Sequence, residues 1–153
     1  MSGTSLSDLS PLLRALTAGS LAFLESVSAR LVFHSGEVIF EEDDPAASFF
    51  VIESGRVGLE VHSPAAPPII VSTLGRGELL GISWLFPPAR WNWTARALEE
   101  TAVVAFDAEA VRVRCEEDTD LALHVYATIA ASAVRRLNAT RVRLLDLYPG
   151  EAS

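Results

Sequence analysis

The sequence predicts a mainly β domain of the β-sandwich or jelly-roll class, with helices before and after it. Eight short apolar segments separated by turn residues fill the middle of the chain, and leucines at helical spacing occur on both sides. The 153 residues, half of them apolar, suffice for one domain with a buried core. We therefore divide the chain into an N-terminal helical segment at residues 1–28, a β domain at 29–107 and C-terminal helices at 108–153.

The first segment is expected to hold two short helices. Its leucines follow a helical period, and Gly19-Ser20 is expected to break it. Pro11 is expected to open a helix directly after Ser10, because proline suits the first helical turn.

The middle of the chain alternates between strands and turns. Turn residues such as Ser54-Gly55 separate the apolar segments, and the proline-rich stretch 64–68 is expected to be a hairpin loop. The expected strands are residues 31–33, 38–40, 49–52, 57–61, 69–74, 79–82, 94–97 and 102–106.

The C-terminal segment predicts one short and one long helix. Asp107 is expected to cap the first, at 108–118, and Asp120 the second, which runs to about Leu147 and ends at Pro149-Gly150. At ~1.5 Å per residue the long helix spans about 40 Å, more than the rest of the domain covers. One face carries a largely apolar stripe of Leu123, Tyr126, Ala127, Ala130, Ala133, Val134, Leu137, Arg141, Leu144 and Leu145.

Charge narrows the range of partners. Twelve arginines, no lysines and twenty acidic residues give a net charge of −8. This balance argues against nucleic-acid binding and against an anionic membrane surface. The apolar-rich stretch 121–134 is too short to span a bilayer, and the first residues do not resemble a signal peptide. We expect a cytoplasmic protein whose partner is a small molecule or another protein.

Catalytic and metal-binding patterns are weak. Cys115 is the only cysteine, which excludes an intrachain disulfide, and His34, His62 and His124 lie in separate segments without a metal-ligand spacing. The acidic run 41–44 lacks the alternating ligands of a calcium loop, and neither a GxSxG nor a Walker motif occurs. We expect no enzyme, no metal and no fixed cofactor.

Three stretches resemble the cyclic nucleotide-binding domain of catabolite activator proteins and protein kinase A regulatory subunits. They are HSGEVIFEEDDPAASFFVIESGRVGL (34–59), LGRGELLG (74–81) and TARALEETAVVAFD (94–107). The resemblance covers roughly residues 12–147 and implies an eight-stranded antiparallel β-roll followed by a short and a long helix. Asp43 stands where the family usually has glycine.

The resemblance also indicates where a ligand would bind. In family members that bind cyclic nucleotides, a short helix and the next loop supply backbone N–H groups and an arginine to the phosphate and a glutamate to the ribose. Here Ile82 takes the glutamate position, Trp91 the arginine position and Asn92 the position after it. The usual cAMP site is therefore not expected, although Arg90, one residue earlier, could reach an anion after a small loop shift.

All three tryptophans of the chain, Trp84, Trp91 and Trp93, lie within a span of ten residues here, and three interpretations follow. They could wall an altered pocket for a planar small molecule or nucleotide-like ligand, or fill the pocket as core, or accompany surviving cyclic-nucleotide binding. The candidate site comprises Gly81, Ile82, Trp84, Arg90, Trp91, Asn92, Trp93 and Thr94.

We expect a non-enzymatic regulatory or sensor module, and alternatively a ligand-free protein-interaction or assembly module with the same fold. In the resembled family the long helix pairs with its twin, which predicts a homodimer, although a monomer stays open. Transcription factors of that family continue into a DNA-binding helix-turn-helix, which the few residues after the long helix would not accommodate. Arg135, Arg136, Arg141 and Arg143 are expected to form a solvated helix face or a docking surface for an acidic protein.

Overall fold

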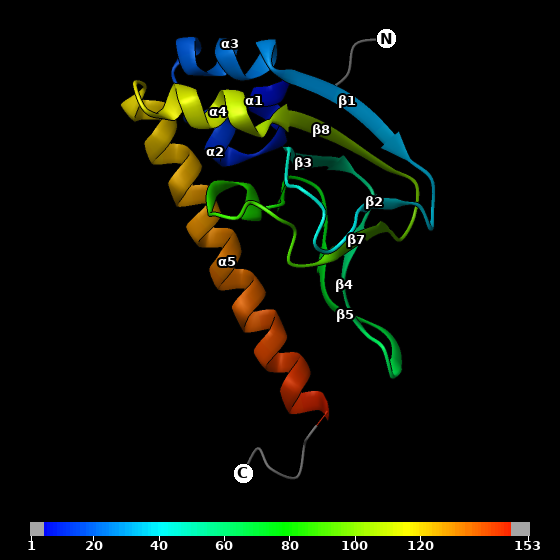
Figure 1. Cartoon of the computed structure of the whole chain (residues 1–153). Coiled ribbons are helices and arrows are strands. Elements are labelled where there is room, and N and C mark those ends of the chain that lie inside the picture. Colours follow the sequence, from blue (N-terminus) through cyan, green and yellow to red (C-terminus); the bar gives the residue numbers. More distant parts are fainter. Residues whose placement is uncertain (1–4, 148–153) are drawn as a thin grey trace.

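The computed structural model describes residues 5–147. Four short helices gather at one end of a β-roll, and one long helix runs along the side of the roll and extends past it (Figure 1). The helices are α1 (Leu6–Leu9), α2 (Pro11–Arg14), α3 (Ala18–Ser26), α4 (Ala108–Cys115) and α5 (Thr119–Leu147), with one 3-10 turn, η1 (Ser83–Leu85).

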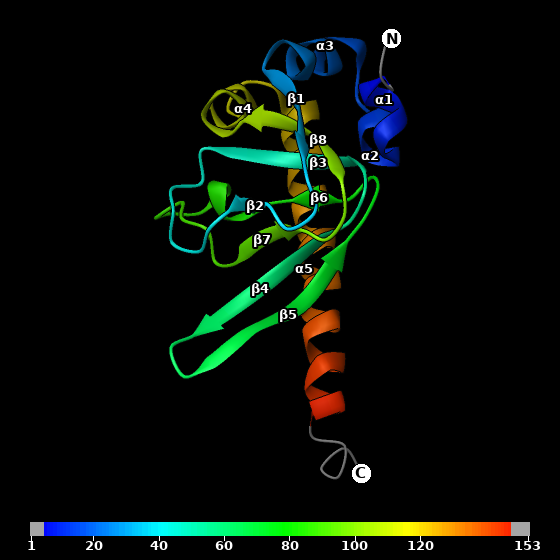
Figure 2. The same cartoon turned by 90° about the vertical axis from the view of Figure 1, so that its right-hand side faces the viewer.

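Eight strands form two four-stranded sheets, with order β1-β8-β3-β6 in one and β2-β7-β4-β5 in the other. All the strand pairings are antiparallel, and the β4–β5 hairpin projects from the roll (Figure 2). The predicted eight-stranded antiparallel roll with flanking helices is confirmed. The strands are β1 (Ser28–Phe33), β2 (Val38–Phe40), β3 (Ser48–Ser54), β4 (Val57–Ser63), β5 (Ala66–Leu74), β6 (Leu79–Leu80), β7 (Thr94–Ala97) and β8 (Thr101–Asp107).

Two of the N-terminal helices, α2 and α3, begin at side-chain caps, whereas α1 has none. Pro11 opens α2 as predicted, and the hydroxyl of Ser10 accepts a hydrogen bond from the backbone N–H of Leu13 at 3.2 Å. The predicted break at Gly19-Ser20 is wrong, because both residues lie in the first turn of α3. The helix begins after Thr17, whose side chain accepts from the backbone N–H of Ser20 at 3.1 Å.

The C-terminal helices confirm one predicted cap and correct the other. Asp107 caps α4 by accepting from the backbone N–H of Ala110 at 3.0 Å. At α5 the cap is Asp118, which accepts from the backbone N–H of Leu121 at 3.1 Å, and this bond holds the pKa of Asp118 below its usual value. Asp120 instead accepts from the backbone N–H of Thr17 at 3.2 Å and shares the Ser20 hydroxyl with Asp118, which ties α5 to the start of α3. The predicted helix end at Pro149-Gly150 lies outside the described residues.

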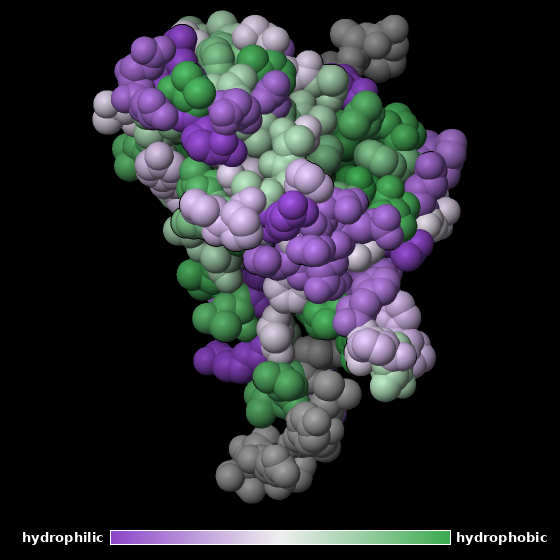
Figure 3. Space-filling view, viewed as in Figure 1, coloured by the Kyte–Doolittle hydropathy of each residue, from purple (hydrophilic) through white to green (hydrophobic). Residues whose placement is uncertain are grey.

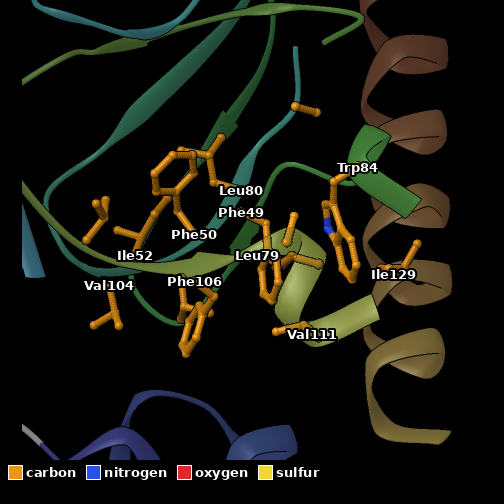
Figure 4. Close-up of a cluster of buried hydrophobic side chains, with 14 of the residues drawn as sticks. Phe49, Phe50, Ile52, Leu79, Leu80, Trp84, Val104, Phe106, Val111 and Ile129 are labelled. Carbon is orange, nitrogen blue, oxygen red and sulfur yellow. The ribbon is translucent and has the colours of Figure 1, made fainter. Parts of the chain in front are cut away.

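Strand β3 supplies the core on both of its faces. Phe49 stacks on Phe106 of β8 with ring centroids 5.1 Å apart, whereas Phe50 stacks on Phe40 of the other sheet at 6.2 Å. Because successive strand side chains point to opposite faces, Phe50 lies between the sheets and Phe49 faces the helices (Figure 4). The roll therefore has an inner core and a second core beneath α4 and α5.

Helix α5 has one packed face and one bare face. Leu121, Ile129, Ser132 and Arg136 are buried, and the helix packs against β5 and β6. All ten residues of the stripe predicted from the sequence are exposed. The 29 residues make a helix about 43 Å long, and its last turns extend beyond the roll (Figure 1).

Candidate functional site

The segment that carries the candidate ligand-binding residues runs from the end of β6 to the start of β7. Gly81 has φ +98, a conformation that favours glycine, and the chain then forms η1, a 3-10 turn of only three residues. The following loop leads to Trp91 and Thr94, where β7 begins.

Trp91 lies inside the roll. Its side chain is 5% exposed, and its ring stacks on Phe40 with centroids 3.9 Å apart and planes 14° apart. Backbone bonds hold it there, since its N–H donates to the carbonyl of Asp44 at 3.0 Å and its carbonyl accepts from the N–H of Asp43 at 2.8 Å. A Cβ added to Gly81 would come within 2.8 Å of two Trp91 ring carbons. The indole therefore occupies the space beside Gly81.

Trp84 packs on the opposite face of β3. Its ring stacks on Phe49 at 4.6 Å and lies against Ile129 of α5 (Figure 4). Its carbonyl accepts from the Arg112 guanidinium at 2.9 Å, which fastens η1 to α4. Trp93 is partly buried against the core. Trp84 and Trp91 are only seven residues apart in sequence, but strand β3 separates them, so they do not face one another.

The polar candidates are engaged with the turn at residues 42–45. Arg90 is exposed and donates from Nη1 to the backbone carbonyl of Asp43 at 2.7 Å. The buried hydroxyl of Thr94 accepts from the backbone N–H of Glu42 at 3.1 Å. Asn92 is exposed, and Ile82 is partly buried against the core. Arg90 and Thr94 thus both hold the turn that covers this end of the roll.

Sequence reasoning missed Glu60, a buried carboxylate on β4. It accepts from Arg96 Nε at 2.9 Å and contacts His62 Nε2 at 3.1 Å. Burial would raise its pKa, but the hydrogen bonds and charges of Arg96 and His62 outweigh burial and lower it. The available signal was the i, i+2 spacing of Glu60 and His62 on one face of a strand. Because both carboxylate oxygens of Glu60 have partners, we interpret its ion pair with Arg96 as a structural link between β4 and β7.

Within residues 5–147, no three side chains of the kinds that bind metals gather at one place. Cys115 is buried, and burial followed by the neighbouring charge of Asp118 raises the pKa of its thiol. A thiol shifted in this direction stays protonated near neutral pH and is a poor nucleophile.

A known family matches the part of the chain that contains the candidate site. The model of the cyclic nucleotide-binding domain matches residues 30–118, from β1 through the candidate site to α4. The chain belongs to the cyclic nucleotide-binding domain family. The resemblance inferred from the sequence motifs is thereby confirmed.

Relatives of this cyclic nucleotide-binding domain include a regulator. The CRP-like cAMP-activated global transcriptional regulator of Mycobacterium tuberculosis is 24% identical over 115 residues, which are 75% of this chain and half of that protein. The N-terminal domain of a transcriptional regulator from Streptomyces coelicolor is 25% identical with a TM-score of 0.65, covering 98% of this chain and all of that one.

A cyclic nucleotide-binding domain from Methylobacillus flagellatus has the same fold. It superimposes with a TM-score of 0.78 at 14% identity, over 97% of this chain and 86% of that one.

No helix in the described part of the chain is both long and apolar enough to cross a bilayer.

Proposed function

We propose that this domain is a non-enzymatic regulatory module whose roll does not bind a cyclic nucleotide in the usual way of its family. The supporting observation is the Trp91 indole, which stacks on Phe40 and lies directly beside Gly81. At the two positions where binding members carry polar side chains, this chain has Ile82 and Trp91. Of the three interpretations of the tryptophan cluster, filling of the pocket by core has the strongest support.

Arg90 does not supply the missing cation in this arrangement. Its guanidinium is bonded to the carbonyl of Asp43 on the outer turn, and the indole of the next residue occupies the roll. Moving Arg90 inward would break this bond and the backbone pairing of Trp91 with Asp43 and Asp44. The loss of these hydrogen bonds would make cyclic-nucleotide binding through Arg90 less favourable.

Thermal unfolding with and without cAMP and cGMP tests the proposal. A ligand at 100 times its Kd stabilises a protein by about 2.7 kcal/mol, several degrees for a domain of this size. We expect no shift with millimolar cAMP or cGMP, and adenosine and guanosine, which lack the phosphate, serve as controls. A shift with a cyclic nucleotide that its nucleoside does not produce, and that Arg135→Gln leaves unchanged, would overturn the proposal.

The partner that the exposed face of α5 fits best is a second copy of the same chain. The bare stripe combines large apolar residues with small ones, and Leu137 is 68% exposed. Apolar side chains follow the outer edge of the helix in Figure 3. Ala127, Ala130 and Ala133 lie on this face and permit close helix approach. A largely apolar exposed face on a helix whose last turns extend past the roll is typical of a protein interface.

Sedimentation velocity tests the homodimer. We expect the wild type to sediment as a dimer and Leu137→Glu to sediment as a monomer with an unchanged circular dichroism spectrum. Val113→Glu is the matched control, because Val113 is also exposed but lies on α4. A monomeric wild type would reject the homodimer and favour the alternative, an interaction module with a separate protein partner on this face.

A further inference from the structure

A cavity of about 280 Å³ lies between the roll and α5. It is separate from the Trp91 site, because strands β5 and β6 form one side and the middle of α5 the other. The residues that give it its chemical character are Ser72, Thr73, Glu78, Ser132, Arg135 and Arg136.

Two residues of this cavity carry buried polar atoms without a partner. Among the described side chains, three buried nitrogen or oxygen atoms lack a hydrogen bond: Trp84 Nε1 at η1, and Ser132 Oγ and Arg136 Nε at this cavity. Ser132 is 3% and Arg136 6% exposed. Proteins seldom leave such groups unsatisfied, and a charged donor is the least tolerated case. Both atoms are buried, so only a species whose acceptor atoms enter directly against them would satisfy both groups.

Charge indicates an anion as that species. Arg135 and Arg136 bring two positive charges, whereas Glu78 is the one acidic residue that lines the cavity. Glu78 lies 3.5 Å from Arg135 Nε and also accepts from the backbone N–H of Gly75 at 2.8 Å. Arg136 donates to the backbone carbonyl of Leu79 at 2.8 Å, a neutral acceptor. The cavity therefore carries an excess of one positive charge on a chain whose net charge is −8.

The pKa of Arg136 agrees with an undercompensated cation. Burial lowers it to about 10; Glu78 opposes this shift, and the charge of Arg135 adds to it. The prediction that Arg136 lies on a solvated or docking face is wrong, because its side chain is buried. Arg136 faces the packed side of α5, together with Ile129 and Ser132.

We propose that this cavity binds a phosphate group, as free phosphate or on a small phosphomonoester, through Arg135, Arg136 and Ser132. Guanidinium groups offer several N–H donors in a planar fork that matches phosphate oxygens. A cavity of this size is at the small end of ligand sites, so it suits a phosphate group better than a dinucleotide. The inference is independent of the proposed function, because it involves neither Trp91 nor the inside of the roll.

An occupied site would connect two parts of the molecule. Arg135 and Arg136 belong to α5, whereas Leu79 and Glu78 belong to β6 and the turn before it. A phosphate held between them would fix α5 against the roll. Ligand occupancy would thereby favour one position of the helix that we propose as the dimer surface.

Isothermal titration with inorganic phosphate, in phosphate-free buffer at constant ionic strength, tests the site. We expect saturable one-to-one binding to the wild type, and glycerol phosphate in a parallel titration distinguishes a monoester from the free ion by its tighter binding. Arg135→Gln should weaken the Kd about tenfold or more, and Ser132→Ala should weaken it severalfold. Both leave Arg136 in place, and Arg135 is mostly exposed, so folding is preserved.

Arg14→Gln is the matched control, since it makes the same charge change at an exposed residue of α2. It should bind phosphate as the wild type does. No saturable binding at about 20 mM phosphate would mean that water fills the cavity and would overturn the proposal. Equal weakening by Arg14→Gln and Arg135→Gln would also overturn it, as a general charge effect. Arg135→Gln further identifies any cyclic nucleotide that binds here rather than in the roll.

Discussion

Inside the roll, Trp91 and Phe40 stack beside Gly81, and the hydroxyl of Thr94 and the carboxylate of Glu60 both have partners. The cavity between the roll and α5 differs, because Ser132 and Arg136 carry buried atoms without partners. Unsatisfied buried polar groups in a native structure need an explanation, and a bound ion is one such explanation. The indole N–H of Trp84 is also unpartnered, but Trp84 lies beneath α5 and not inside the roll. The difference therefore favours a ligand outside the roll over one inside it.

Trp91→Ala should have the largest effect of the variants considered. If the indole is core, its removal should lower the free energy of unfolding by about 3–5 kcal/mol, as expected for a buried aromatic. Chemical denaturation measures this, and Asn92→Ala, at an exposed neighbour, should stay within about 0.5 kcal/mol of the wild type. A loss below about 1 kcal/mol for Trp91→Ala would mean that the indole is a replaceable wall of a pocket.

Gly81→Ala should come next. The substitution puts a side chain on a residue at φ +98 and within 2.8 Å of the Trp91 ring, so we expect a loss of roughly 1–3 kcal/mol. A double-mutant cycle with Trp91→Ala separates the two causes, because the steric part disappears without the indole whereas the backbone strain persists. Strict additivity of the two changes would contradict the contact between Gly81 and Trp91.

Thr94→Val tests the partnered hydroxyl of the roll, in contrast to the unpartnered hydroxyl of Ser132 at the cavity. Valine keeps the shape of threonine but leaves the backbone N–H of Glu42 without its acceptor. We expect the free energy of unfolding to fall by about 1 kcal/mol, the usual net contribution of such a bond. Urea denaturation of the variant beside the wild type measures it, and an unchanged midpoint would show that water replaces the hydroxyl.

The elements of this fold followed from local signals, and the errors came from contacts distant in sequence. Turn residues such as Gly55 separated the strands correctly, and Pro11 and Asp107 opened their helices as predicted. Asp120 was predicted as the cap of α5, but Asp118 caps it. Asp120 is held by the start of α3, where the backbone N–H of Thr17 and the hydroxyl of Ser20 donate to it. No pattern within the C-terminal segment contains that information.

The candidate site was predicted in part. Alignment with the family placed Trp91 at the arginine position. That Trp84 packs on the opposite face of β3 follows from the alternation of Phe49 and Phe50, which requires the neighbouring strands to be known. Arg136 is the clearest omission. Its spacing of seven from Ile129 puts it on the buried side of α5, but an arginine is ordinarily assigned to solvent.

Ser132→Ala should have the smallest effect on stability and the most specific effect on binding. Ser132 is as buried as Thr94, but its hydroxyl has no partner, so removing it should leave the free energy of unfolding unchanged or raise it by up to about 1 kcal/mol in phosphate-free buffer. In phosphate the order should reverse, because the wild type gains binding energy that the variant partly loses. Urea denaturation in both buffers measures the two effects. A clear loss without phosphate would mean that ordered water already satisfies this hydroxyl, and the contrast between the cavity and the roll would then fail.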